Sequence, residues 1–82
     1  MGTFKIRIVD EDGVGVRGAE VSCHYPLTHQ SRYTDSHGWA EFDVHGGLMS
    51  FPVVDHLYVN GVEVDTSLRT EDGDTFSYTL PS

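Results

Sequence analysis

Histidine is the residue type in this sequence that most suggests a chemical role, because five histidines occur among only 82 residues. Imidazole nitrogens and carboxylates are ligands that zinc, nickel and copper accept. If the strands follow one another as an antiparallel meander, the loops at 26–30, 45–50 and 65–74 meet at one end of the fold. The candidate ligands of a weakly held divalent metal ion at that end are His24, His29, His45, Asp72 and Asp74, beside Glu71. No two histidines are spaced i, i+2 within a predicted strand, so solvated surface histidines are the alternative interpretation.

Two acidic clusters offer the oxygen ligands that calcium prefers. One is the run Asp10–Asp12, and the other is formed by Glu71, Asp72 and Asp74. The first run lacks the length and the terminal glutamate of an EF-hand loop. Meander connectivity also places the two clusters at opposite ends of the fold. Weak calcium binding and solvated turn carboxylates are both compatible with this pattern.

Trp39 is the strongest candidate for contact with a ligand. The alternating segment 40–44 directs its apolar side chains inward, which leaves Trp39 on the outer face of the same strand. Aromatic faces bind sugar rings and protein partners, and tryptophan is enriched at interface positions that dominate binding. Tyr33 and Tyr58 are candidates to extend Trp39 into an aromatic strip. The alternative is that Trp39 folds beneath a loop or across the sheet edge.

The sequence does not bring together the groups of a nucleophilic catalyst. Cys23 falls on the inward face of its predicted strand with Val21 and Tyr25, where a thiol is inert. No serine has the G-x-S-x-G context of a nucleophile elbow. The glycines at 13–15 join two strands and do not open a helix, as a phosphate-binding loop would. We therefore predict that the protein is not an enzyme.

The elements that position these residues are short strands, because apolar residues recur with a period of two. The stretch 48–59 is nearly continuously apolar, interrupted by Pro52, Asp55 and His56, and predicts a central strand over 53–59 that is buried on both faces. Asn60-Gly61 predicts a type I′ hairpin, whose two central residues need positive φ. The predicted inward side chains of the alternating strands are Phe4, Ile6, Ile8, Ala19, Val21, Cys23, Tyr25, Ala40, Phe42, Val44, Val62, Val64, Phe76, Tyr78 and Leu80.

Length and charge narrow the fold and the partners further. A chain of 82 residues supports a single domain over 1–82, and the strand spacing predicts an all-β, antiparallel two-sheet sandwich of about seven strands. The net charge of −8 argues against nucleic acid and anionic membranes as partners. No apolar run reaches the length of a membrane span. The single cysteine excludes an internal disulfide.

Two segments resemble known β-sandwich modules. Residues 9–21, VDEDGVGVRGAEV, are similar to the D-x-x-G-x-P-V-x-G-A-x-V opening of transthyretin-like and carboxypeptidase-regulatory-like modules. Residues 34–42, TDSHGWAEF, resemble the T-D-x-x-G-x-A/F-x-F turn of the same modules, and bacterial immunoglobulin-like domains share much of this pattern. Val16 departs from the proline that these families often carry. We expect Gly18-Ala19 to allow a close strand approach, Asp35 to accept turn N–H groups and Gly38 to take positive φ.

The resemblance implies a non-catalytic accessory role, as a structural spacer or a protein-interaction domain. Carbohydrate or protein binding around Trp39 and divalent-metal binding are the alternatives. The hydroxyisourate hydrolases resemble transthyretin, but their terminal tyrosine–arginine–glycine–serine motif is missing from the end of this sequence, YTLPS. Members of these families are mostly extracellular or attached to the cell surface as parts of larger proteins, so the resemblance further implies such a location and neighbouring domains. The last predicted strand, 75–80, is a candidate for edge-to-edge pairing, so a monomer or a dimer is expected.

Overall fold

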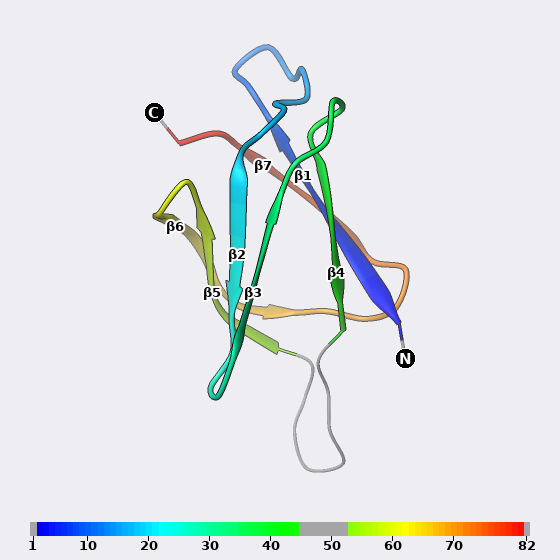
Figure 1. Ribbon diagram of the computed structural model, residues 1–82, viewed down its shortest axis with the longest axis vertical. Coiled ribbons are helices and arrows are strands. Elements are labelled where there is room, and N and C mark those ends of the chain that lie inside the picture. The colour runs from blue at the N-terminus through cyan, green and yellow to red at the C-terminus, as the bar shows by residue number, and fades with distance from the viewer. Residues whose placement is uncertain (1, 45–52, 82) are drawn as a thin grey trace.

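Seven strands form two sheets in the computed structural model, which describes residues 2–44 and 53–81 (Figure 1). The strands are β1 (Thr3–Val9), β2 (Glu20–His24), β3 (His29–Tyr33), β4 (Trp39–Asp43), β5 (Val53–Val59), β6 (Val62–Arg69) and β7 (Thr75–Thr79). The three-stranded sheet has the order β4-β1-β7, and the four-stranded sheet has the order β3-β2-β5-β6. The predicted all-β sandwich of seven strands is confirmed.

The core lies between the two sheets and follows the predicted alternation. Phe4 on β1 is fully buried and stacks on Phe42 of β4, with ring centroids 5.5 Å apart. Phe76 of β7 meets the same Phe4 ring edge-on at 6.3 Å. Side chains from both sheets complete the buried cluster, whose members are Phe4, Ile6, Ile8, Ala19, Val21, Cys23, Ala40, Phe42, Val54, Leu57 and Val59.

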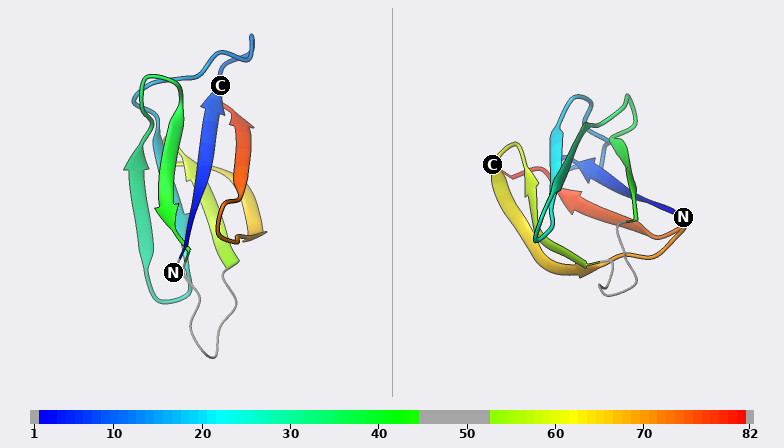
Figure 2. Two further views of the ribbon diagram at one scale, coloured as in Figure 1. Left: turned by 90° about the vertical axis from the view of Figure 1, so that its right-hand side faces the viewer. Right: turned by 60° about the horizontal axis from the view of Figure 1, so that its bottom comes forward.

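One strand pair departs from a purely antiparallel sandwich. β7 pairs with β1 in parallel, whereas β4 pairs with β1 antiparallel (Figure 2). A hairpin cannot join parallel neighbours, and β7 follows β6, which belongs to the other sheet. The parallel pairing therefore results from the crossing between sheets. β7 is an edge strand, as expected for the last strand, and dimerisation through it stays a prediction.

β5 does not have two buried faces, although its bounds agree with the prediction. Leu57 and Val59 are fully buried, but His56 is exposed and Tyr58 is only half-buried. β5 lies between β2 and β6 within its sheet, and this position saturates its backbone hydrogen bonds without covering its outer side. The outer side chains of β5 therefore remain accessible.

The β5–β6 hairpin has the predicted turn but a shifted register. Asn60 and Gly61 have φ of 51° and 82°. An irregularity between Leu57 and Tyr58 places Asp65 opposite Leu57, and Asp65 accepts a hydrogen bond of 2.7 Å from the Tyr78 hydroxyl. Val62, predicted to face inward, is 50 % exposed. β6 also extends through residues that the sequence assigned to a loop.

The close backbone approach occurs at different glycines from the predicted one. Gly18 has a positive φ of 77°, and a Cβ there would meet open space. A Cβ at Gly15 would collide with the His37 carbonyl, and one at Gly38 would collide with the Ile8 carbonyl. The loop after β1 and the turn before β4 therefore cross in direct backbone contact.

Candidate functional site

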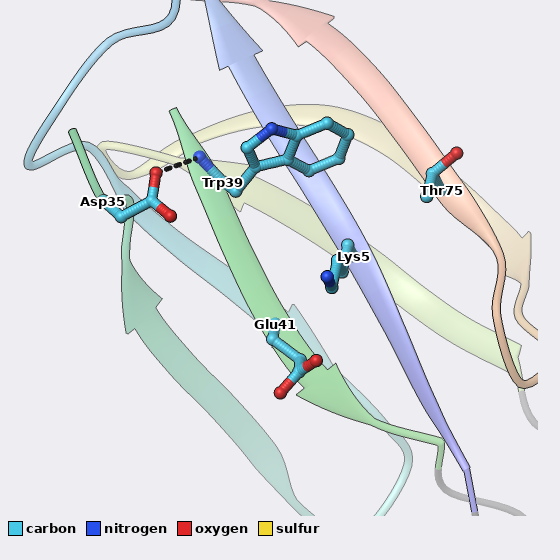
Figure 3. A pocket seen from close by; sticks show the side chains of 5 residues that line it. All are labelled: Lys5, Asp35, Trp39, Glu41 and Thr75. Carbon is cyan, nitrogen blue, oxygen red and sulfur yellow. Dashed lines mark hydrogen bonds between the residues drawn. The ribbon is translucent and has the colours of Figure 1, made fainter. Parts of the chain in front are cut away.

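A hollow of about 560 Å³ lies on the outer face of the β4-β1-β7 sheet. This volume is within the range of small-molecule sites. Figure 3 shows that its side chains come from all three strands and from the turn before β4. The lining residues are Lys5, Asp35, Trp39, Glu41 and Thr75.

Strand alternation explains why these side chains share one face. The inward positions of β1 are apolar and fully buried, so Lys5 and Arg7 point outward between them. In the register of the sheet, Lys5 lies opposite Glu41 on one side and Thr75 on the other, and Arg7 lies opposite Trp39. The outer face therefore carries two cross-strand rows of polar and aromatic groups.

A hydrogen-bonded turn holds Trp39 in position. One carboxylate oxygen of Asp35 accepts the backbone N–H groups of His37 at 2.8 Å and Trp39 at 3.0 Å. The hydrogen bond from Trp39, and after it the one from His37, lowers the pKa of the Asp35 carboxyl below its ordinary value. Gly38 closes the turn with a φ of 86°, as predicted. The start of β4 is thereby fixed through the backbone of Trp39 itself.

The indole of Trp39 is half-buried and lies across β1 (Figure 3). The Arg7 guanidinium carbon lies 5.7 Å from the ring centroid, and Arg7 Nε donates to the His37 carbonyl at 3.2 Å. The predicted outward position of Trp39 is confirmed. Because Arg7 lies over the ring, the part of the indole that can stack on a ligand is the surface that lines the hollow, and the neighbouring ammonium group, carboxylates and hydroxyl can hydrogen-bond to the edges of that ligand.

Tyr33 and Tyr58 do not extend this site. Both belong to the four-stranded sheet, whereas Trp39 belongs to the three-stranded one. Tyr33 is 69 % exposed and donates to Glu20 at 3.4 Å, and Tyr58 packs against His24. The chain passes from one sheet to the other between β3 and β4, so Tyr33 and Trp39 belong to different sheets although they are close in sequence.

The predicted metal ligands are only partly brought together. His24 and His29 are cross-strand partners, and their rings stack with centroids 5.4 Å apart. Asp72 accepts the Thr3 N–H at 3.0 Å, beside the first strand of the other sheet. The predicted ligand His45 lies outside the described residues.

Asp74 is the last residue of the predicted ligand set, and its carboxylate accepts a hydrogen bond within its own turn. One of its carboxylate oxygens accepts the Glu71 N–H at 3.0 Å. Within 2–44 and 53–81, no three His, Cys, Asp or Glu side chains stand where they could hold one metal ion. The five-residue site predicted from the sequence is therefore not assembled in the described part of the chain.

His56 is a neighbour of His24 that sequence reasoning missed. The two residues are directly opposite in the β2–β5 pair, and His56 Nδ1 lies 2.5 Å from a carboxylate oxygen of Glu63. Strands β2 and β5 are separated by two other strands in sequence, so only their register reveals this proximity. The signal available in the sequence was the alternation of His56 and Tyr58 with buried Leu57.

Two further residues singled out in the sequence, Asp10 and Cys23, contribute to the turn structure and to the core. An oxygen of Asp10 accepts the N–H groups of Asp12 at 2.9 Å and Val14 at 3.0 Å, which shapes the acidic loop. Burial raises the pKa of the Cys23 thiol to about 12, so this group stays protonated at neutral pH. The inward position predicted for Cys23 is confirmed.

Comparison with protein-family models found no match, and searches of curated proteins and of solved structures likewise found none. The transthyretin-like resemblance therefore rests on the two sequence segments alone. Among the described residues, no helix has the length and apolarity that crossing a membrane requires.

Proposed function

We propose that this chain is a non-catalytic binding module that takes a neutral saccharide unit on the face around Trp39. The observation that carries the proposal is the hollow on this face, in which a half-buried indole lies among Lys5, Glu41 and Thr75. The C–H groups of a sugar ring stack on an aromatic face, while its hydroxyls require donors and acceptors at the rim.

The charges of the face favour a neutral ligand over an ionic one. Lys5 lies opposite Glu41 in register, so the two charges offset each other locally. Arg7 is already engaged by the indole and by the His37 carbonyl. A saccharide hydroxyl can bridge the ammonium group of Lys5 and the carboxylate of Glu41 without adding a charge to the face.

Preorganisation supports binding at this place. The Asp35 turn fixes the backbone at the start of β4, and β4 and β7 both pair with β1. A site on paired strands loses little conformational entropy when a ligand arrives, so more of the contact energy appears as affinity.

Titration with a panel of neutral oligosaccharides, followed by Trp39 fluorescence and by the indole N–H signal in NMR, tests the proposal. We expect saturable binding and a loss of about 30-fold or more in Trp39→Ala, as for a dominant interface tryptophan. Tyr33→Ala, on the other sheet, is the matched control and should bind like the wild type. A panel without saturable binding, or equal binding by Trp39→Ala, would overturn the proposal.

A spacer role is the second candidate, and the parallel pairing of β1 with β7 favours it. The start of β1 and the end of β7 lie at opposite ends of the long axis (Figure 2, left). Modules with this geometry connect in series without folding back, as expected of stalk repeats in an extracellular or cell-surface protein. Small-angle scattering from two copies joined in tandem should show an extended particle, and a compact particle would contradict the spacer role.

A further inference from the structure

The outer face of the four-stranded sheet carries three histidines in one cross-strand row. His29 on β3 is opposite His24 on β2, and His24 is opposite His56 on β5. This face lies across the core from the Trp39 hollow, so a site on it is separate from the proposed saccharide site.

His24 and His29 form the tightest pair of the row. The Tyr25 N–H donates to the Thr28 carbonyl at 2.8 Å and closes the β2–β3 hairpin. Hydrogen-bonded and non-hydrogen-bonded pairs alternate along an antiparallel ladder, so the next pair, His24 and His29, is of the non-hydrogen-bonded kind. Side chains of such pairs approach most closely. The two rings accordingly stack at 5.4 Å with an interplanar angle of 22°.

Neighbouring side chains support this pair from one side. The Tyr58 ring meets the His24 ring edge-on, with centroids 4.8 Å apart. One row further along the strands, the hydroxyls of Ser22 and Ser31 lie 2.9 Å apart, which confirms the close approach of β2 and β3 side chains on this face. His24 is half-buried and His29 is exposed, so the pair is supported and still open to solvent.

We propose that His24 and His29 chelate a divalent transition-metal ion, with Cu²⁺ bound most tightly. Imidazole is a preferred ligand of Cu²⁺, Ni²⁺ and Zn²⁺, and Cu²⁺ stands highest in the affinity order. Metal–nitrogen bonds of about 2.0–2.1 Å set the two ligand nitrogens roughly 3–4 Å apart. The rings, whose centroids are 5.4 Å apart, must therefore tilt toward each other, and the exposure of His29 leaves room for this movement. The net charge of −8 favours a bound cation.

The proposed ligand set is the pair and does not include His56. Glu63 holds the His56 ring at 2.5 Å, and in the described residues no three ligand side chains surround one point. Water completes the coordination of the ion, so the site has open positions. A two-histidine chelate of this kind binds more weakly than a closed structural site.

Isothermal titration with CuCl₂ alone and NMR line broadening by Cu²⁺ test this inference. We expect one saturable ion per chain and early broadening of the signals of His24, His29 and Tyr58. The Trp39 indole N–H lies on the other sheet and should broaden last. Absence of saturable binding, or broadening that begins elsewhere, for example at the chain's amino group, would overturn the proposal.

Single-residue variants distinguish Cu²⁺ binding by the His24–His29 pair from Cu²⁺ binding by any exposed histidine. His24→Gln and His29→Gln should each weaken Cu²⁺ binding roughly tenfold to hundredfold, because a single imidazole loses the effective-concentration gain of a chelate. His37→Gln, in the exposed turn before β4, is the matched control and should bind as the wild type does. Thermal melts of all three variants verify folding. Unchanged affinity in either pair variant, or an equal loss in the control, would contradict the assignment.

Discussion

The two outer faces of the sandwich obey the same alternation but are organised by different means. On the three-stranded sheet, a local turn of five residues, 34–38, positions Trp39 through backbone hydrogen bonds. On the four-stranded sheet, the registers of β2, β3 and β5 bring His24, His29 and Tyr58 into ring contact. A site built on a local turn is visible in sequence. A site built on strand register becomes visible only when the pairing is known.

The supports of the two faces also differ in packing. The turn before β4 is pressed against the loop after β1 at Gly15 and Gly38. The β5–β6 hairpin turns at Asn60-Gly61, and a Cβ added at Gly61 would meet open space. Both Gly38 and Gly61 have positive φ, of 86° and 82°, so they differ mainly in this packing.

Substitution of these two glycines by alanine tests the difference most strongly. Gly38→Ala adds a backbone collision with Ile8 to the left-handed strain, and we expect a loss of about 3 kcal/mol in unfolding free energy. Gly61→Ala incurs the strain alone, about 1 kcal/mol. Urea unfolding measures both, and equal losses would show that packing around the two turns is alike.

Hydroxyl deletions should give the next largest contrast. The Thr34 hydroxyl is buried, accepts the Ala19 N–H at 2.9 Å and donates to the Val16 carbonyl. Thr34→Val leaves both backbone groups without this partner and should lower the unfolding free energy by about 2 kcal/mol. Ser22→Ala, in the exposed pair with Ser31, should change it by less than about 0.5 kcal/mol. A similar loss in both variants, measured by urea unfolding, would count against this ranking.

The smallest expected effect concerns the acid response of the Asp35 turn. The pKa of Asp35 is lowered in the folded state, so its unfolded form binds more protons as the solution becomes acidic. Its contribution to stability is therefore present above the unfolded pKa and is lost as pH falls through the folded pKa. Asp35→Asn should be less stable than the wild type at pH 7, and this gap should narrow at pH 2.5. A gap that widens in acid would show the opposite sign of linkage.

The local patterns of the sequence predicted much of the fold. The Asn60-Gly61 turn, the inward positions of β1 and β4, and the outward position of Trp39 depend only on residues within a few positions of one another. Such features follow from the backbone conformation of a turn and from the alternation of side chains along a strand. Both are determined by residues that are close in sequence.

Three predictions were wrong where distant strands intervened. β5 was expected to be buried on both faces, but its outer side is open at His56. Val62 was expected to be covered in the core, but although it lies opposite buried Val59, it stands at the turn end of edge strand β6 and is 50 % exposed. Gly18 was expected at a close approach, which Gly15 and Gly38 make instead. Each error concerns which other parts of the fold cover or approach a residue, and the sequence of a single strand carries no information about that.

By itself, the sequence determined most of the strands, most of the core side chains and the turn that presents Trp39, because these depend on local alternation and on residues that tolerate positive φ. Only the tertiary structure decided that β7 runs parallel to β1, that Tyr58 lies on the sheet opposite to Trp39, and that His24 pairs with His29 and His56 in one row. The physical reason is that strand order and register arise from burying both sheets against each other. This burial is a property of the whole chain and of no segment within it.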